Sequence, residues 1–262
     1  MKLRPAAVAG RFYPADPVEL ATSVDAVLAA ARPIGRRPVA LIAPHAGYRY
    51  SGAVAGAVYA QLAGCRATVT RVVVLGPAHF VPLTGMAVPD VDAFATPLGP
   101  VPVALDARQA ALELPGVEIA DHPHAAEHAI ETQLPFLLRS LGPDVPVLPV
   151  LVGATELEAV ARLLSALLDG PDTVAVVSTD LSHYLDQAGA RRRDASTAAA
   201  IVARDPHALR PFDACGYRPL CGLLRYAAEH SLGVELLRLT TSADAGADPR
   251  RVVGYGAFLL AA

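Results

Sequence analysis

Short runs of hydrophobic residues, bounded by proline, glycine or charged positions, recur along the chain and predict strands. These runs cover residues 39–43, 72–75, 147–152, 174–178, 234–239 and 252–260. Apolar residues at helical spacing predict helices after residue 16, over 51–62, 107–114 and 156–168, around 195–203 and from about 223. Strands that are apolar throughout are typical of a parallel sheet covered on both faces. The pattern therefore predicts an α/β fold, with a central, mostly parallel sheet and helices on both faces.

Three local features support this prediction. Asp16 can cap the first helix, and Pro17 suits its first turn. Gly52 and Gly56 lie one turn apart in the second helix, where they are expected to let it pack closely on the sheet. The strand, helix and strand over residues 39–75 have the order of a right-handed parallel crossover.

The stretch from residue 81 to 103 breaks the pattern, because it is rich in proline and glycine. It is expected to be a long insertion beside the site, with a turn over residues 96–100, and such loops often form walls or lids. No internal repeat, linker or low-complexity segment divides the chain. We therefore expect one domain over residues 1–262.

Histidines follow two of the predicted strands. His45 follows the strand that ends at residue 43, and His79 follows the next strand after a Gly-Pro break. Ligands of parallel sheets bind beyond the carboxyl ends of the strands, so the two side chains suggest one shared metal site. Two imidazoles need a third protein ligand to form a catalytic site with an open position. The candidates are Asp180 at a third strand end, the ionisable cluster around His128, and Cys215.

Composition narrows the function. The chain has 262 residues, 53% of them hydrophobic and 18% charged, which supports a folded core and excludes disorder. No apolar run approaches the roughly 20 residues of a membrane span, and no secretion signal is recognisable, so we expect a soluble, cytoplasmic protein without a membrane partner. The net charge of −3 gives no footprint for nucleic acid. Lys2 is the only lysine, which excludes a Walker-type phosphate loop.

A set of ordered motifs resembles the MEMO-like family, whose bacterial and archaeal members are known as AmmeMemoRadiSam system protein B. The motifs are Ala-Pro-His-Ala-Gly-Tyr at 43–48, Leu-Gly-Pro-Ala-His at 75–79, Glu-His-Ala-Ile-Glu at 127–131, Val-Leu-Val-Gly at 150–153, Ser-Thr-Asp-Leu-Ser-His at 178–183 and Ala-Cys-Gly at 214–216. The resemblance covers essentially the whole chain. It implies a fold related to the class III extradiol dioxygenases, which cleave catechol rings with non-haem Fe(II).

The resemblance implies His45, His79 and Cys215 as metal ligands. A cysteine replaces the glutamate of the dioxygenases, and its soft thiolate favours iron or copper(I), with zinc also suitable. Without the resemblance, Cys215 would be interpreted as a small buried apolar residue. Because the related dioxygenases have a catalytic histidine at the position of His183, that residue is the candidate general base, and Asp180 would orient a ligand or water.

Three further residues are expected in the pocket or around the ligands. Tyr48 flanks a motif histidine. His128 and Glu131 lie one turn apart and are expected to face the site from a helix that begins after Pro123. The alternative for the last two is an ordinary helix start.

Three functions remain open. The leading hypothesis is a non-haem iron (or copper) redox protein or dioxygenase-like enzyme, which acts on an unknown small-molecule substrate. The second is a scaffold that binds a peptide or protein in a relict pocket; the family is associated with a radical-SAM protein and an AMMECR-type protein as partners. The third is a zinc hydrolase, because residues 124–128 match the His-x-x-Glu-His pattern of some metallopeptidases.

Overall fold

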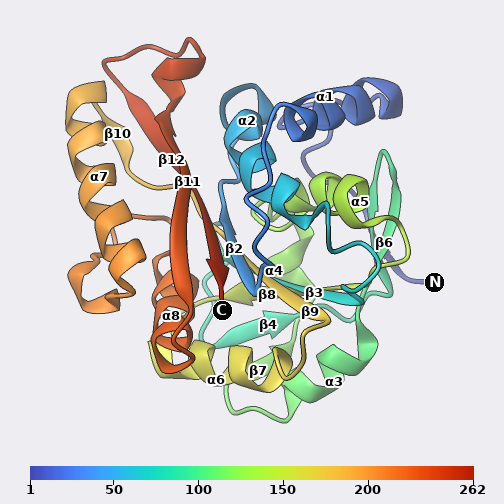
Figure 1. Cartoon of the computed structure of the whole chain (residues 1–262). Coiled ribbons are helices and arrows are strands. Elements are labelled where there is room, and N and C mark those ends of the chain that lie inside the picture. Colours follow the sequence, from blue (N-terminus) through green and yellow to red (C-terminus); the bar gives the residue numbers. More distant parts are fainter.

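The computed structural model describes residues 1–262 and contains one large and one small sheet (Figure 1). The large sheet runs in the order β10-β12-β2-β9-β3-β8-β4-β7, and β11 pairs with β12. Its strands are β2 (Ala40–Ala43), β3 (Arg71–Pro77), β4 (Met86–Val88), β7 (Val117–Ile119), β8 (Val147–Val152), β9 (Thr173–Ser178), β10 (His183–Leu185), β11 (Gly233–Thr241) and β12 (Val252–Ala261).

The four central strands β2, β9, β3 and β8 are parallel, whereas β12 and β4 flank them in antiparallel orientation. The predicted α/β fold with a mostly parallel sheet is therefore confirmed. The two strands that carry the motif histidines are parallel, as expected, but β9 lies between them.

Helices cover both faces of the sheet (Figure 1). One face packs against α1 (Pro17–Ala29), α2 (Tyr48–Tyr59) and α5 (Leu134–Leu141), and the other against α3 (Leu105–Leu112), α6 (Leu157–Leu167), α7 (Gln187–Ala203) and α8 (Tyr217–Glu229). Strand β3 shows why both faces need cover. Val72 and Val74 enter one core, while Val73 and Leu75 enter the other. None of the helices is both long and apolar enough to cross a bilayer.

The predicted helices are present, with shifted ends. Asp16 caps α1 by accepting from the amides of Val18 and Glu19. Helix α2 begins three residues earlier than predicted and continues as the 3₁₀ turn η1 (Ala60–Leu62), and α7 and α8 also begin earlier. The remaining short helices are α4 (His122–Ala125), η2 (Glu131–Gln133), η3 (Pro206–Ala208) and η4 (Ser242–Ala245).

The stretch from 81 to 103 is more ordered than an insertion loop. Its strand β4 joins the main sheet, and β5 (Ala93–Thr96) and β6 (Gly99–Pro102) form the small sheet with β1 (Leu3–Arg4). The turn predicted over 96–100 is confirmed, because Thr96 pairs with Gly99 across it. This sheet holds the N-terminal segment in place, which becomes important for the site.

Gly56 serves a different contact from the one expected. A Cβ atom on Gly56 would lie 2.8 Å from the carbonyl oxygen of Val27, so α2 approaches helix α1 closely, rather than the sheet, at this point. Gly52 meets only Tyr48 of its own helix.

Replacing Gly56 by alanine is therefore expected to reduce the free energy of unfolding by about 1–3 kcal/mol, because backbone atoms of α1 must move. Denaturant unfolding measures this change. Gly64→Ala is the control, since no atom lies within 4 Å of its added Cβ. Equal stability of the two variants would contradict the close helix contact.

Candidate metal centre

Three imidazoles meet at the carboxyl end of the central strands. His45 follows β2 and His79 follows β3, and their ring centroids lie 5.2 Å apart. The ring of His128 lies 5.3 Å from that of His45 and 4.8 Å from that of His79. One ligand atom from each residue falls within 4.8 Å of the others. This group could hold a metal ion.

The group runs from the interior to the surface. His45 is buried, His128 is half-buried and the side chain of His79 is 26% exposed. A bound ion would therefore face the protein on one side and be reachable from solvent on the other.

Hydrogen bonds determine which nitrogen of His45 is free. The Ser178 hydroxyl donates to the carbonyl of Ala129 and accepts from the Gln133 side-chain amide. Since that hydroxyl has only one proton, the Nδ1 of His45, 2.9 Å away, must donate to it. The Gln133 amide is itself oriented, because its nitrogen donates to the carbonyl of Pro44. Nε2 of His45 therefore carries the lone pair that a metal requires.

Glu127 determines which nitrogen of His79 donates a hydrogen bond. Its carboxylate accepts from Nδ1 of His79 at 2.9 Å, and also from the backbone amides of His79, His128 and Ala129. Burial acts to raise the pKa of Glu127, but the hydrogen bond and charge of His79, together with the amides, lower it to about 2. The ionised carboxylate can only accept, so Nδ1 of His79 donates, and in the neutral ring Nε2 is the nitrogen free to bind a metal. A carboxylate behind a histidine is the usual support of a metal ligand.

His128 has an unpaired nitrogen. Its Nδ1 lies 3.2 Å from Glu127 but is not aligned for a hydrogen bond, and this buried atom has no other partner. No side chain or backbone group of the protein bonds to Nε2. An unpaired imidazole beside two oriented ones fits a site for a cation.

Burial also keeps two of these rings neutral. It lowers the pKa of His45 to about 3, with a further contribution from His79, and lowers the pKa of His128 to about 4, with a further contribution from His45. Neutral imidazole is the form that binds metal. Protons therefore do not compete for these two ligands at neutral pH.

The helix predicted after Pro123 stops after one turn, at Ala125. A continuing helix would use the carbonyls of His124 and Glu127, but the guanidinium of Arg4 binds both of them. The Glu127 carboxylate takes the amides of His128 and Ala129 instead. The chain therefore leaves the helix, and His128 turns toward the other histidines.

Because the helix ends at Ala125, the His-x-x-Glu-His pattern of residues 124–128 does not lie on a helix. His124 and His128 do not lie on one helical face, and the Nε2 of His124 lies 3.1 Å from the carbonyl of Ala87, away from the histidine group. Residues 124–128 therefore do not form the helical zinc site of those metallopeptidases.

The prediction that Glu131 and His128 face the site from one helix is wrong. Its carboxylate pairs with Arg4 and accepts from the Tyr13 hydroxyl and from the amides of Ala7 and Val8. Both members of this ion pair are buried. Glu131 therefore anchors the N-terminal segment, whose Phe12 packs on the ring of His128 at 4.7 Å.

Tyr48 also has contacts outside the histidine group. Its hydroxyl donates to the carbonyl of Thr132, and its ring packs on Phe136. These contacts hold the start of α2 against α5.

Cys215 lies beside His45, with 3.2 Å between its sulfur and Nε2. Its amide donates to the carbonyl of Asp180, and the amide of Asp180 donates to its sulfur at 3.3 Å. Burial and the charge of Asp180 raise the pKa of Cys215 to about 12. The side chain is therefore a thiol at neutral pH when no cation is near.

Asp180 and His183 follow the carboxyl end of β9. Asp180 accepts from the amides of His45 and Ala46, so it positions the loop that carries His45. Burial raises the pKa of Asp180, although these bonds oppose the shift. Nδ1 of His183 lies 2.8 Å from the carbonyl of Leu181, which can only accept, so Nδ1 donates and the neutral ring has its lone pair on Nε2.

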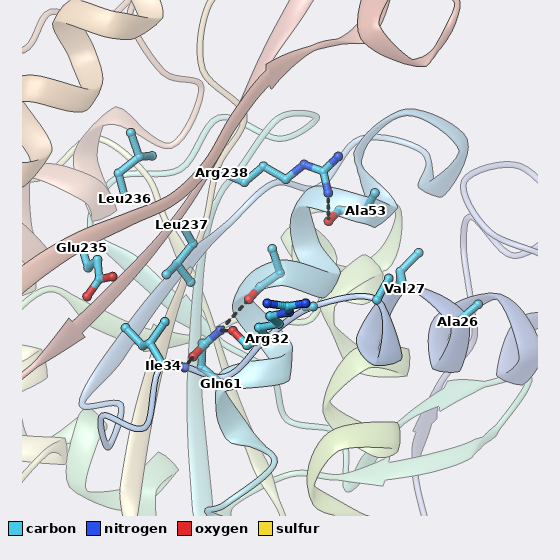
Figure 2. Close-up of a pocket in the computed structure, with 13 residues that line it drawn as sticks. Ala26, Val27, Arg32, Ile34, Ala53, Gln61, Glu235, Leu236, Leu237 and Arg238 are labelled. Carbon is cyan, nitrogen blue, oxygen red and sulfur yellow. Dashed lines mark hydrogen bonds between the residues drawn. The ribbon is translucent and has the colours of Figure 1, made fainter.

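Two surface pockets differ in the residues that line them. A pocket of about 450 Å³ between α1, α2 and β11 is lined mainly by apolar residues, together with Gln61, Glu235 and two arginines (Figure 2). It contains no histidine or cysteine, and Gln61 uses its side chain to bind the backbone of Arg32 and Ile34. A smaller pocket of about 310 Å³ includes Cys215, whose sulfur contacts His45.

The sequence alone does not predict which residues orient the imidazoles. Ser178 and Glu127 occur in motifs without an assigned role, and Gln133 is not singled out. The available signal was the position of Ser178 at the end of a buried strand, level with the histidines.

Comparisons with known proteins give one consistent family. The Memo-like protein family model matches residues 4–259. A MEMO1 family protein of Methanopyrus kandleri is 33% identical over 280 residues, covering 98% of this chain and 98% of the relative. One of Aeropyrum pernix is 32% identical over 284 residues, covering 98% and 99%. One of Aquifex aeolicus is 36% identical over 201 residues, covering 74% and 72%.

Proposed function

The chain belongs to the Memo-like protein family, and on this basis we propose that it is a mononuclear metal protein that carries out redox chemistry on a small substrate. The observation that carries the proposal is the group His45, His79 and His128, in which two rings are oriented with Nε2 free. We propose Cys215 as an additional sulfur ligand beside His45.

The spacing of one donor pair fits such an ion, while Sγ of Cys215 lies outside the group whose ligand atoms are all within 4.8 Å of one another. In a tetrahedral site with metal–nitrogen and metal–sulfur bonds of about 2.0 and 2.3 Å, the nitrogen and sulfur atoms lie about 3.5 Å apart. Nε2 of His45 and Sγ of Cys215 are separated by 3.2 Å, close to that value. Imidazole and thiolate donors together suit iron and copper, with zinc as the redox-inactive alternative. Iron or copper bound here would supply one-electron chemistry.

The remaining residues have roles that follow from their contacts. Glu127 and Ser178 hold the rings of His79 and His45 in one tautomer. We propose His183 as the group that accepts a proton from substrate, because its Nδ1 is occupied by the bond to Leu181 and the neutral ring would accept at Nε2. Asp180 would position His45 through its amide.

Proton release on metal binding tests the sulfur ligand. Because the pKa of Cys215 is raised to about 12 before metal binds, coordination as thiolate must release about one proton per metal ion near pH 8. Histidines are neutral at that pH. Titration calorimetry with Zn(II) in buffers of different ionisation enthalpy should therefore give about one more released proton for the wild type than for Cys215→Ala.

Cys65→Ala is the matched control, since Cys65 is buried among the helices and should leave proton release unchanged. Equal proton release from wild type and Cys215→Ala would remove sulfur from the ligand set and leave the three histidines.

A further inference from the structure

The pocket that includes Cys215 has a distinct construction. It lies beyond the carboxyl ends of β3 and β8, and its volume of about 310 Å³ is at the small end for ligand sites. Its lining includes the apolar residues Pro77, Ala78, Leu83, Val152, Ala154, Pro211 and Pro219, together with polar surface of similar extent. Such a volume suits a molecule with about one ring.

The pocket has a single charged side chain, Arg218, in the first turn of α8. One end of its guanidinium is fixed, because Nη1 donates to the carbonyl of Thr155 at 2.8 Å. Nε and Nη2 have no partner in the protein, and this pair of donors matches the two oxygens of a carboxylate. The same turn contains no acidic residue and no side-chain cap, so its backbone dipole also favours an anion.

The pocket adjoins the proposed metal centre through Cys215. Cys215 forms part of its wall and contacts Nε2 of His45, while Pro77 and Ala78 immediately precede His79. A molecule held by Arg218 would therefore extend past Pro77 and Ala78 toward Cys215.

We propose that this pocket binds a small carboxylate with an apolar body of about one ring, its carboxylate on Arg218 and its body directed toward Cys215. The inference that such a molecule is the substrate rests on the proposed function. The inference that it binds in this pocket does not rest on that function.

Benzoate is the probe, and its neutral isostere benzamide is the comparison. Ligand-observed NMR titration of the full-length protein, without metal and with Zn(II), should give benzoate binding that weakens at least about tenfold in Arg218→Gln, because a charge-assisted pair is lost. Benzamide should bind at least about tenfold more weakly than benzoate to the wild type. Arg225→Gln is the matched control, since Arg225 lies on the same helix and pairs with Glu229 at the surface.

A second variant tests the apolar half. Ala154 is exposed on the pocket wall, so Ala154→Phe should block the pocket without disturbing the core. Loss of benzoate binding in both variants supports the proposal. Equal affinity in wild type and Arg218→Gln, or equal affinity for benzoate and benzamide, overturns it.

Metal binding and benzoate binding are tested independently of each other. Protein that binds Zn(II) but not benzoate retains the proposed metal centre and overturns the carboxylate site. Protein that binds benzoate through Arg218 but binds no metal retains the carboxylate site and removes the proposed function. Replacing Zn(II) by paramagnetic Co(II) should also broaden the benzoate resonances, and unchanged line widths would contradict the contact with the metal centre.

Discussion

Replacement of Glu131 by glutamine should destabilise the fold by about 3–5 kcal/mol, because it leaves the Arg4 guanidinium buried without its counter-ion. The Glu131 side chain is fully buried and that of Arg4 is 5% exposed. Glutamine also replaces one acceptor oxygen by a donor, where the Tyr13 hydroxyl and the amides of Ala7 and Val8 need acceptors. Denaturant unfolding of wild type and variant measures the loss.

Glu229→Gln provides the matched control. Glu229 pairs with Arg225 at the surface, where an ion pair contributes at most about 1 kcal/mol. The double variant Arg4→Met, Glu131→Leu should lose less stability than the sum of the two single changes, because no charge remains buried. A loss below about 1 kcal/mol for Glu131→Gln would contradict the anchoring role.

Replacement of Glu127 by glutamine should weaken metal affinity by about 10–100-fold, the usual effect of removing a carboxylate behind a histidine ligand. Nδ1 of His79 and the amides of His128 and Ala129 all donate to Oε1, whereas the amide of His79 donates to Oε2. A neutral amide has only one acceptor oxygen and carries no charge, so it must lose one of these two sets of bonds. The segment that carries His79 and His128 is then held less firmly. Competition with a chromogenic chelator measures the affinity for Zn(II) and Co(II).

Glu113→Gln is the control for this change, because Glu113 is exposed and contacts only Gln109. Wild-type affinity in Glu127→Gln would show that His79 does not depend on the carboxylate. Circular dichroism distinguishes a lost ligand geometry from a lost fold.

The two strand-end histidines were predictable because their signal is local. An apolar strand followed by a turn places the next polar side chain at the sheet edge. The order of the strands was not local information, and the insertion of β9 between β2 and β3 depends on a segment about 100 residues away in the chain.

His128 and Glu131 show where local patterns fail. Their spacing predicted one helical face, yet Arg4, far away in sequence, binds the carbonyls that would continue the helix. The same arginine pairs with Glu131 and draws it away from the histidines. A periodicity argument includes no partner at a distance of more than a hundred residues. Only the folded chain therefore shows that His128 lies beside His45 and His79.

Metal content is the measurement that tests the central claim most directly. Protein purified anaerobically and incubated with Fe(II) is desalted and measured by elemental analysis as wild type, His45→Ala and His207→Ala. His207 is exposed and lies outside the histidine group. We predict near-stoichiometric iron in the wild type and in His207→Ala, and loss of most of it in His45→Ala. Equal iron in all three, or none in the wild type, would contradict a metal centre at these histidines.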